Sequence, residues 1–392
     1  MIHAGRLIAA LRSRDASSYV GVPCSFLAPF IDEAICDSTV RYTAAVSEGE
    51  ATGIAFGTWL AGRTPVTLCQ NSGLGNMVNP ITSLVHPCRV PLLMLCTWRG
   101  QPGLSDEPQH ELMGRALGAL LDTIEVEWTL LGDTATQLDA AIETAWESMT
   151  QRSLPFCLIV EKNTIARTEA DPPPIRERRS GLAIDLLANG RCTRFEALER
   201  ILGTVSDEVA LVATTGKTGR ELFTLCDRPQ HFYCVGAMGC ASAIGLGLSL
   251  GTDRPVLVLD GDGAALMRLG NMATIGLEGP SNLVHVILDN GVHDSTGGQQ
   301  TAAANTRFGD VAIACGYRRA YSCDAPCELE DAISEALAAP GPHLVHMKIQ
   351  PGSRGQLGRP TVHPADVARR FRNFAGRQTI QPSGVVAQRS PV

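Results

Sequence analysis

Short apolar runs alternate along the chain with longer segments whose apolar residues recur at helical spacing. In the first half, for example, the apolar run at residues 65–70 follows a helix-like segment at residues 48–62. Strands that alternate with helices in this way predict an α/β fold with mostly parallel sheets. The other strands predicted in this half lie at residues 18–23, 40–46, 91–98, 124–128 and 155–162, and the other helices at residues 26–35 and 135–149.

Two stretches break the alternation. Residues 166–192 are charged and contain a run of three prolines, so we predict an interdomain linker there. Residues 377–392 are polar and predict a mobile tail. The chain is therefore expected to form two domains, residues 1–165 and residues 193–376. Each should be a mostly parallel sheet flanked by helices, with no middle domain between them.

Two apolar runs of the second half each end in a polar cluster, Gly-Asp-Gly after the first and Asp-Asn-Gly after the second. The carboxyl ends of parallel strands meet at one edge of a sheet, so Asp262 and Asn290 are expected to face one small volume. Their carboxylate and amide oxygens suit Mg²⁺ rather than zinc. Gly261 and Gly263 let the backbone approach an anion, and a helix beginning near Ala264 offers it free N–H groups. Either cluster alone is commonly a turn, but the two together predict a Mg²⁺-diphosphate site.

The two clusters resemble the diphosphate motif of thiamine diphosphate enzymes, in which Asn-Asn follows Gly-Asp-Gly by about thirty residues. Here Asp289 replaces the first asparagine, and Asn290 matches the second, which is the metal-ligand position. The resemblance implies two thiamine diphosphate-binding domains. It also implies that Asp262, Asn290 and the backbone carbonyl of Val292 bind Mg²⁺ together with the cofactor diphosphate. We expect further cofactor contacts from Gly261, Gly263, Ala264, Thr215 and Lys217.

In thiamine diphosphate enzymes a glutamate at the start of the helix after the second strand bonds to the pyrimidine ring of the cofactor. Glu48, in Ser-Glu-Gly-Glu-Ala, resembles that residue and is expected to bind the cofactor and act in catalysis. The residues alone leave two alternatives, because Glu48 could merely favour a helix N-terminus and Glu50 competes for the role. Met238, in Val-Gly-Ala-Met-Gly, resembles the apolar residue that bends the cofactor, and an ordinary core methionine is its alternative.

The composition excludes several other classes of protein. The 392 residues suffice for two domains with full cores, and 44% hydrophobic against 19% charged residues indicates a globular chain. A net charge of -7 argues against a nucleic-acid partner, and no apolar run approaches the length that spans a bilayer. The first fifteen residues predict an amphipathic helix rather than a signal peptide. The 13 cysteines lie mostly in apolar runs without a Cys-x-x-Cys pair, which favours a cytoplasmic protein without a zinc site.

Longer segments resemble the phosphonopyruvate decarboxylase family, a group of thiamine diphosphate-dependent enzymes close to the sulfopyruvate decarboxylases. These segments are GVPCSFL, SEGEATGIAFGTWLAGR, QNSGLGNMVNPITSL, WRGQPGLSDEPQH, DGDGAALMRLGNMATIG and NLVHVILDNGVHDSTGGQQT. The resemblance implies decarboxylation of 3-phosphonopyruvate to phosphonoacetaldehyde and CO₂ in phosphonate natural-product (antibiotic) biosynthesis. It also implies a homo-oligomer, at least a dimer, in which Glu48 of one subunit faces the diphosphate site of another.

A small anionic 2-oxo acid is recognised by basic and hydroxyl donors, and such residues gather in the predicted strand-end loops. We expect substrate contacts from Arg99, from Asn71 and Ser72 in a predicted Gly-rich turn at residues 71–76, and from Ser295. Each has an alternative, and Arg99 in particular could pair with an acidic residue of its own loop.

Basic residues in other strand-end loops extend this set of candidates. Lys217 and Arg220 follow another strand end and could bind the diphosphate or the substrate, or else stabilise a helix end. His110 or His293 is expected to handle protons, and the sequence does not choose between them.

Other functions remain open at the sequence level. The nearest are decarboxylation of sulfopyruvate or another 2-oxo acid, and carboligation with the same cofactor. A different class is an inactive cofactor-binding or regulatory subunit, which the presence of Glu48 with Asp262 and Asn290 disfavours. A Rossmann dehydrogenase is also disfavoured, because no Gly-x-Gly-x-x-Gly opens a strand-helix-strand unit followed by an acidic ribose ligand.

Overall fold

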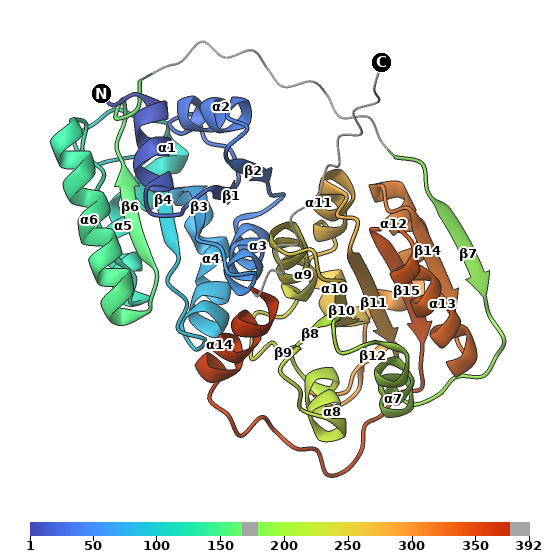
Figure 1. The fold of residues 1–392 in the computed structure, drawn as a ribbon. Helices are drawn as coiled ribbons and strands as arrows, with labels where there is room; N and C mark the ends of the chain where they lie inside the picture. Colours follow the sequence, from blue (N-terminus) through green and yellow to red (C-terminus); the bar gives the residue numbers. More distant parts are fainter. Residues whose placement is uncertain (167–178, 377–392) are drawn as a thin grey trace, which may run out of the picture.

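Buried apolar strands and the helices between them build two parallel sheets, as the alternating pattern predicts. The structure is a computed structural model, and it describes residues 1–166 and 179–376. The domains lie side by side, the first in blue to green and the second in green to red (Figure 1). The predicted α/β fold with two sheets flanked by helices is confirmed.

The first domain is a six-stranded sheet in the order β2-β1-β3-β4-β6-β5, with every neighbouring pair parallel. Its central strands are buried on both faces, as parallel sheets require. The strands are β1 (Ser18–Gly21), β2 (Arg41–Ala44), β3 (Pro65–Gln70), β4 (Leu93–Thr97), β5 (Glu127–Leu130) and β6 (Phe156–Val160). The helices are α1 (Ala4–Arg12), α2 (Ala28–Cys36), α3 (Glu48–Leu60), α4 (Leu74–Pro80), α5 (Glu111–Thr123) and α6 (Ala135–Arg152), with the short turns η1 (Asn71–Gly73), η2 (Ile81–Val85) and η3 (Pro108–His110).

The second domain is a seven-stranded sheet in the order β7-β14-β15-β11-β10-β8-β9, again with parallel neighbours. Its strands are β7 (Leu182–Leu186), β8 (Ala210–Ala213), β9 (His231–Tyr233), β10 (Val256–Gly261), β11 (Leu283–Asp289), β14 (Arg319–Cys323) and β15 (His343–Lys348). The hairpin of β12 (Val292–His293) and β13 (Gln299–Gln300) projects beyond β11. The helices are α7 (Arg194–Thr204), α8 (Lys217–Leu225), α9 (Ala241–Gly251), α10 (Asp262–Met267), α11 (Asn271–Glu278), α12 (Phe308–Cys315), α13 (Pro326–Ala338) and α14 (Pro364–Ala375), with the turn η4 (Ala302–Asn305).

Helix α3 of the first domain packs along α9 of the second. Glycines allow the two helix backbones to approach, because a Cβ at Gly57 would collide with the carbonyl of Ile244 and one at Gly247 with that of Ile54. Every residue of α3 is buried. The packing therefore makes one continuous core across the two domains.

Helix α14 ties the C-terminal end of the described chain back to the first domain, where Figure 1 shows it in red below α3 and α4. The guanidinium of Arg372 donates to the backbone carbonyls of Trp59 and Gly62 and lies over the Trp59 ring. Helix α14 thus belongs to the interdomain contact as well as to the second domain.

Two sequence predictions about organisation need correction, and one pair of elements was missed. Within the predicted linker at residues 166–192, strand β7 pairs with β14 at the edge of the second sheet. Its side chains are mostly exposed, so it carries no apolar run. The predicted turn at residues 71–76 is helical and continues into α4, and α12 with β14 was not predicted at all. The other part of the linker, residues 167–178, and the predicted mobile tail, residues 377–392, lie outside the described residues.

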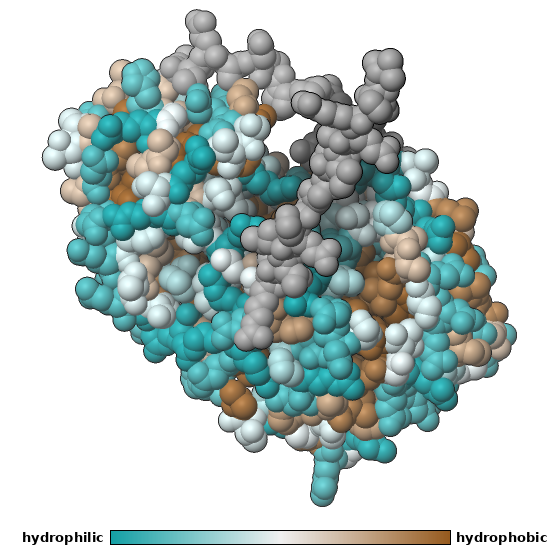
Figure 2. Space-filling model, in the orientation of Figure 1, coloured by the Kyte–Doolittle hydropathy of each residue, from teal (hydrophilic) through white to brown (hydrophobic). Residues whose placement is uncertain are grey.

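Polar side chains cover most of the face seen in Figure 2, and apolar patches interrupt it chiefly over the second domain. Within the described ranges, the helices are either too short or too polar to cross a bilayer.

Candidate cofactor and active site

The carboxyl ends of β10 and β11 bring the two polar clusters together. Gly261 pairs in register with Leu288, so Asp262 and Asn290 emerge at the same edge of the sheet. A cavity of about 310 Å³ lies at this edge. It is lined by every second-domain residue predicted for the site, namely Thr215, Lys217, Met238, Gly261, Asp262, Gly263, Ala264, Asn290, Val292, His293 and Ser295.

Asp262 is suited to hold a cation. Its side chain is buried and accepts one side-chain hydrogen bond, from the hydroxyl of Thr301. Burial raises the pKa of this carboxyl and the nearby charge of Asp289 raises it further, whereas the Thr301 hydrogen bond lowers it. The backbone N–H groups of Gly263 and Asp262 also lower this pKa, but the hydrogen bonds offset burial only in part, so a bound cation would stabilise the carboxylate.

The amide of Asn290 is oriented by its neighbours. Its Nδ2 donates to Asp294 at 2.7 Å, and Asp294 in turn accepts from the Arg194 guanidinium at 2.6 Å. Its Oδ1 is therefore turned away from Asp294, and the backbone N–H of Val292 reaches it at 3.2 Å. In the described part of the chain no three His, Cys, Asp or Glu side chains converge, so a cation here would rely on amide and carbonyl oxygens beside Asp262. Such a set of hard oxygen donors fits a small divalent cation.

Glycines shape the wall where a diphosphate would lie. Gly261 has open space on its side-chain face, and Gly216 adopts a φ of +95° that favours glycine. A Cβ at Gly263 would lie 2.5 Å from the His293 ring, so only glycine lets that ring approach the turn. Lys217 adds a cation that makes no ion pair within residues 1–166 and 179–376. The cavity thus fits an anionic diphosphate as well as a cation.

Asp289 explains how this chain departs from the Asn-Asn pattern. Its carboxylate accepts from the backbone of Gly291 at 3.0 Å and lies 2.9 Å from Nε2 of His346. Asp289 does not line the cavity. The change therefore affects a contact outside the cavity and leaves Asn290, the predicted metal ligand, in place.

Glu48 begins α3, capped by Ser47, and its side chain is buried. One carboxylate oxygen accepts from Asn76 at 2.8 Å. The other lies so close to Gly73 that a Cβ there would collide with it, so only glycine fits. Glu50 has a structural task instead, because its carboxylate accepts from the backbone of Val46 at 2.6 Å and so closes the start of the helix. This geometry favours Glu48 over Glu50 as the cofactor-binding residue.

The start of α3 contacts the segment that carries Met238. The thiol of Cys240 lies 3.7 Å from the carbonyl of Gly49, and Arg268 reaches Ser47 at 3.3 Å. From η2, the hydroxyl of Ser83 accepts from the backbone of Ala237 at 2.9 Å. The first domain therefore lies directly against one wall of the cavity within a single chain.

Two family descriptions cover these two halves. "Thiamine pyrophosphate enzyme, N-terminal TPP binding domain" matches residues 3–118, and "Thiamine pyrophosphate enzyme, C-terminal TPP binding domain" matches residues 214–347. A phosphonopyruvate decarboxylase of Streptomyces viridochromogenes is 48% identical over 388 residues, which is 98% of this chain and 97% of that protein. The chain belongs to the phosphonopyruvate decarboxylase family of thiamine pyrophosphate enzymes.

Other relatives agree with this placement. A phosphonopyruvate decarboxylase of Streptomyces hygroscopicus is 48% identical over 96% of this chain and 94% of its own. A sulfopyruvate decarboxylase of Methanosarcina acetivorans is 31% identical over 83% of this chain and 86% of its own. Among solved structures, benzoylformate decarboxylase from Polynucleobacter necessarius matches with a TM-score of 0.72 at 13% identity, over 90% of this chain and 99% of that one, which shows the shared fold.

None of the five first-domain residues predicted for this thiamine pyrophosphate site lines its cavity, namely Glu48, Asn71, Ser72, Arg99 and His110. The Asn71 amide is used to join two strand ends, donating to the carbonyl of Arg99 and accepting from its N–H. Arg99 forms a two-pronged pair with Asp106 at 2.5 and 2.7 Å, the alternative that the sequence left open. Ser72 accepts from Gln70. The substrate roles of Asn71, Ser72 and Arg99 therefore gain no support from the geometry.

His110 is different from these three. It is buried, and its Nδ1 has no hydrogen-bond partner among the described residues. The buried His285 and His343 share this feature and do not line the cavity, so it leaves His110 able to bind a ligand without marking it as a site residue. Both histidines thus stay candidates for proton transfer, His293 in the cavity wall and His110 in the first domain.

Sequence reasoning missed several residues that support the thiamine pyrophosphate site. Thr301 holds Asp262, Arg194 holds Asp294, and Asn76 holds Glu48. Each lies far from its partner or in another element, so no local pattern marks it. Asn76 and Thr301 could have been suspected, because both lie in segments that resemble the family.

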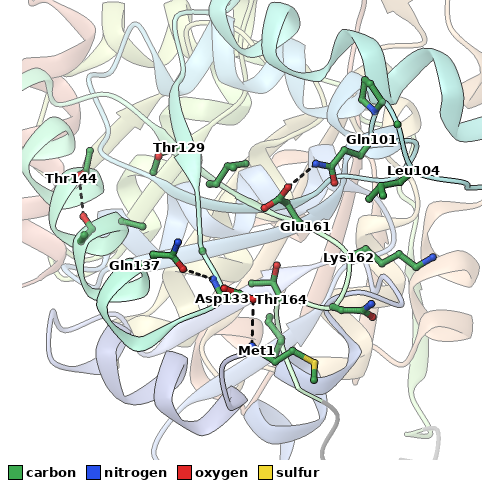
Figure 3. Close-up of a pocket in the computed structure, with 18 residues that line it drawn as sticks. Met1, Gln101, Leu104, Thr129, Asp133, Gln137, Thr144, Glu161, Lys162 and Thr164 are labelled. Carbon is green, nitrogen blue, oxygen red and sulfur yellow. Dashed lines mark hydrogen bonds and ion pairs between the residues drawn. The ribbon is translucent and has the colours of Figure 1, made fainter.

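A larger hollow of about 1290 Å³ lies elsewhere on the first domain, between β5, β6 and α6. Figure 3 shows that its polar side chains face one another, with Gln101 bonded to Glu161 and the N-terminus of Met1 beside Asp133. None of the predicted site residues lines it. Size alone therefore does not mark the active site here.

Proposed function

We propose that this protein decarboxylates 3-phosphonopyruvate to phosphonoacetaldehyde and CO₂ with thiamine diphosphate and Mg²⁺. The observation that carries the proposal is the 48% identity along 98% of the chain to a relative named for this reaction. The cavity at the ends of β10 and β11 supports it, because it gathers the second-domain residues expected for cofactor and metal.

In this proposal Asp262, the Oδ1 of Asn290 and the carbonyl of Val292 hold Mg²⁺, and Lys217 with the Gly216 turn holds the diphosphate. Asp294 fixes the Asn290 amide so that its oxygen is free for the metal. Thiamine diphosphate, when bound, supplies the electron sink that amino-acid side chains lack for the carbanion left by departing CO₂.

The remaining tasks fall to side chains of the protein. Glu48 offers a carboxylate, aligned by Asn76, to the pyrimidine ring of the cofactor. Met238, in the cavity wall, holds the cofactor bent. His293 or His110 donates the proton that replaces CO₂. These roles require a closed, water-poor site, which suits the burial of Glu48, Asp262 and Asn290.

The deciding experiment compares purified protein on phosphonopyruvate, sulfopyruvate and pyruvate, with thiamine diphosphate and Mg²⁺ supplied and the products identified. We expect the highest kcat/KM with phosphonopyruvate and an aldehyde product. A preference for pyruvate, or ketol in place of aldehyde, would overturn the proposal. Failure to bind thiamine diphosphate in calorimetry would indicate a non-catalytic subunit instead.

Sulfopyruvate decarboxylation is the second candidate, because a relative of that name is 31% identical over 343 residues. The two substrates differ only in the terminal group, a nearly dianionic phosphonate against a singly charged sulfonate. The same assay separates the two substrates. We rank phosphonopyruvate first because the identity to the phosphonopyruvate decarboxylases is higher.

The proposal extends to the setting of the enzyme. A homo-oligomer, at least a dimer, is supported by large apolar side chains exposed beside the site, such as Val46, Val235 and Met267. A cytoplasmic location fits 13 cysteines that form no disulfide. A place in phosphonate (antibiotic) biosynthesis would follow from the reaction itself, which commits a phosphonate carbon skeleton by irreversible loss of CO₂.

A further inference from the structure

A second cavity of about 310 Å³ adjoins the cofactor cavity. The two share Thr215, Gly216 and Arg220 in their walls. The second cavity lies between α8, the end of β9 and residues 350–363, the segment between β15 and α14 that we call the C-terminal strap. A small ligand held in one cavity is thus in direct reach of the other.

The C-terminal strap is fixed against α8 at Gly358. The backbone N–H of Gly358 donates to the Thr224 hydroxyl at 3.0 Å, and a Cβ there would lie 3.2 Å from the Phe223 ring. Near its start, the N–H of Gly352 donates to Asp294, the residue that orients Asn290. These contacts place the next residue, Arg359, in the cavity wall.

The charges of this cavity are unbalanced. Arg220 comes from α8 and Arg359 from the strap, and neither makes an ion pair within the described ranges. No aspartate or glutamate lines the cavity, whose other walls are largely apolar, including Val235 and Val362. Neighbouring arginines are instead paired, as Arg370 is with Asp227. Two uncompensated guanidinium groups facing one cavity favour an anionic ligand.

We propose that Arg220 and Arg359 bind the tetrahedral anionic group at the end of the substrate opposite its 2-oxo carboxylate. This inference rests on the proposed function, and it names the phosphonate as the group bound. Two planar guanidinium forks match a dianionic phosphonate with several oxygen acceptors, and they match a singly charged sulfonate less well. Pyruvate, which has only a methyl group there, gains nothing from them.

Arg359→Gln is the principal test, because Arg359 lines only the second cavity and so leaves the diphosphate contacts in place. We expect KM for phosphonopyruvate to rise about tenfold or more, the loss typical of one charged hydrogen-bonding partner. The ratio of kcat/KM for phosphonopyruvate over pyruvate should fall by a similar factor, with sulfopyruvate in between. Arg359→Lys should recover part of the loss, and thiamine diphosphate affinity should stay within a fewfold.

Arg369→Gln is the matched control, because Arg369 is an exposed arginine of the adjacent helix α14, paired with Asp366 outside the cavity. It should leave the substrate ratio unchanged. An unchanged ratio in both Arg220→Gln and Arg359→Gln, in protein that turns over phosphonopyruvate, would overturn the inference while the proposed function stands.

A binding measurement separates failure of the proposed anion site from failure of the proposed reaction. Calorimetry with phosphonoacetate, an unreactive phosphonate, should show binding to the wild-type holoenzyme and at least tenfold weaker binding to Arg359→Gln. This result supports the anion site even if phosphonopyruvate is not decarboxylated, in which case only the proposed reaction fails. Equal phosphonoacetate affinity in the wild type and both arginine variants would refute the site.

Discussion

At the scale of single residues, Glu48 offers the sharpest test of the chemistry. Glutamine in its place can still bond to Asn76 but cannot carry the charge that the pyrimidine ring requires. We expect Glu48→Gln to keep thiamine diphosphate affinity within about tenfold and to lower kcat by about a hundredfold or more. Calorimetry and steady-state kinetics measure the two effects separately, and full activity of the variant would refute the role of Glu48.

Glu50→Gln is the control for that experiment, because Glu50 lies two residues away on the same helix and is also buried. It closes the helix start through Val46 and has no proposed contact with the cofactor. We expect a lower Tm with kcat little changed. A loss of kcat as large as in Glu48→Gln would mean that the two residues had been assigned the wrong way round.

Asp262 and Asp289 form a second matched pair of carboxylates, one facing the cavity and one turned to His346. Asp262→Ala removes a charged ligand, so we expect Mg²⁺-dependent binding of thiamine diphosphate to weaken by about tenfold or more. Asp289→Asn restores the family residue and should leave that affinity unchanged. Titrations of cofactor at several Mg²⁺ concentrations measure both, and equal affinities in the two variants would remove Asp262 from the metal site.

The predicted residues that the structure places in one cavity share a property, which is that a short motif at a strand end fixes their position. Asp262 and Asn290 are such residues, and register alone brings them together. Arg99 and Asn71 also follow strand ends, yet they are taken up by contacts with each other and with Asp106. A residue type in a loop does not reveal whether a partner nearby already satisfies it, so loop residues were predicted less well.

At the scale of elements, His231 in β9 links strand stability to pH. Burial lowers the pKa of His231 to about 4, against an ordinary value of 6.5, and only the Cys226 carbonyl and the charge of Asp227 oppose this. Below about pH 6.5 the unfolded chain therefore binds a proton that the folded chain does not bind. The free energy of unfolding falls as the pH is lowered to about 4. Between about pH 7 and pH 5 the loss should be about 2 kcal/mol.

Urea unfolding of the wild type and of His231→Gln at both pH values tests this link. The variant lacks the titrating group, so its free energy of unfolding should change less between the two conditions by about 2 kcal/mol. His3→Gln is the control, since His3 is exposed and its side chain caps nothing. If His231→Gln and the wild type lose stability equally, another group is responsible.

Long buried elements were predicted well, and short or exposed ones were not. Strand β3 begins and ends where the pattern placed it, and α3 begins at Glu48 as predicted. Strand β7 was missed because an edge strand with exposed side chains has no apolar run. Residues 71–76 resembled a turn because of their glycines, but Gly73 is needed where the Glu48 carboxylate lies against the backbone.

At the scale of the whole molecule, the contact between α3 and α9 could not be predicted from the sequence. Both helices are largely apolar, which indicates burial but names no partner. Their glycines acquire meaning only when the helices are seen to cross, as at Gly57 and Gly247. The same contact carries the start of α3 to the Met238 segment, so the arrangement of domains determines the geometry of the site.

The resemblance to the family predicts that Glu48 completes the site of a neighbouring subunit, and a mixing experiment tests this prediction. Glu48→Gln and Asp262→Ala should each have little activity alone at a cofactor concentration too low to saturate Asp262→Ala. If sites lie between subunits, a mixed dimer contains one site with both residues intact, so random exchange should restore about a quarter of wild-type activity. Native mass spectrometry verifies that subunits have exchanged. A mixture of wild type with the variant that carries both Glu48→Gln and Asp262→Ala serves as the reference for exchange. No recovery after verified exchange would mean that Glu48 serves its own chain, a result that the packing of α3 against α9 and the contact of Gly49 with Cys240 would then explain.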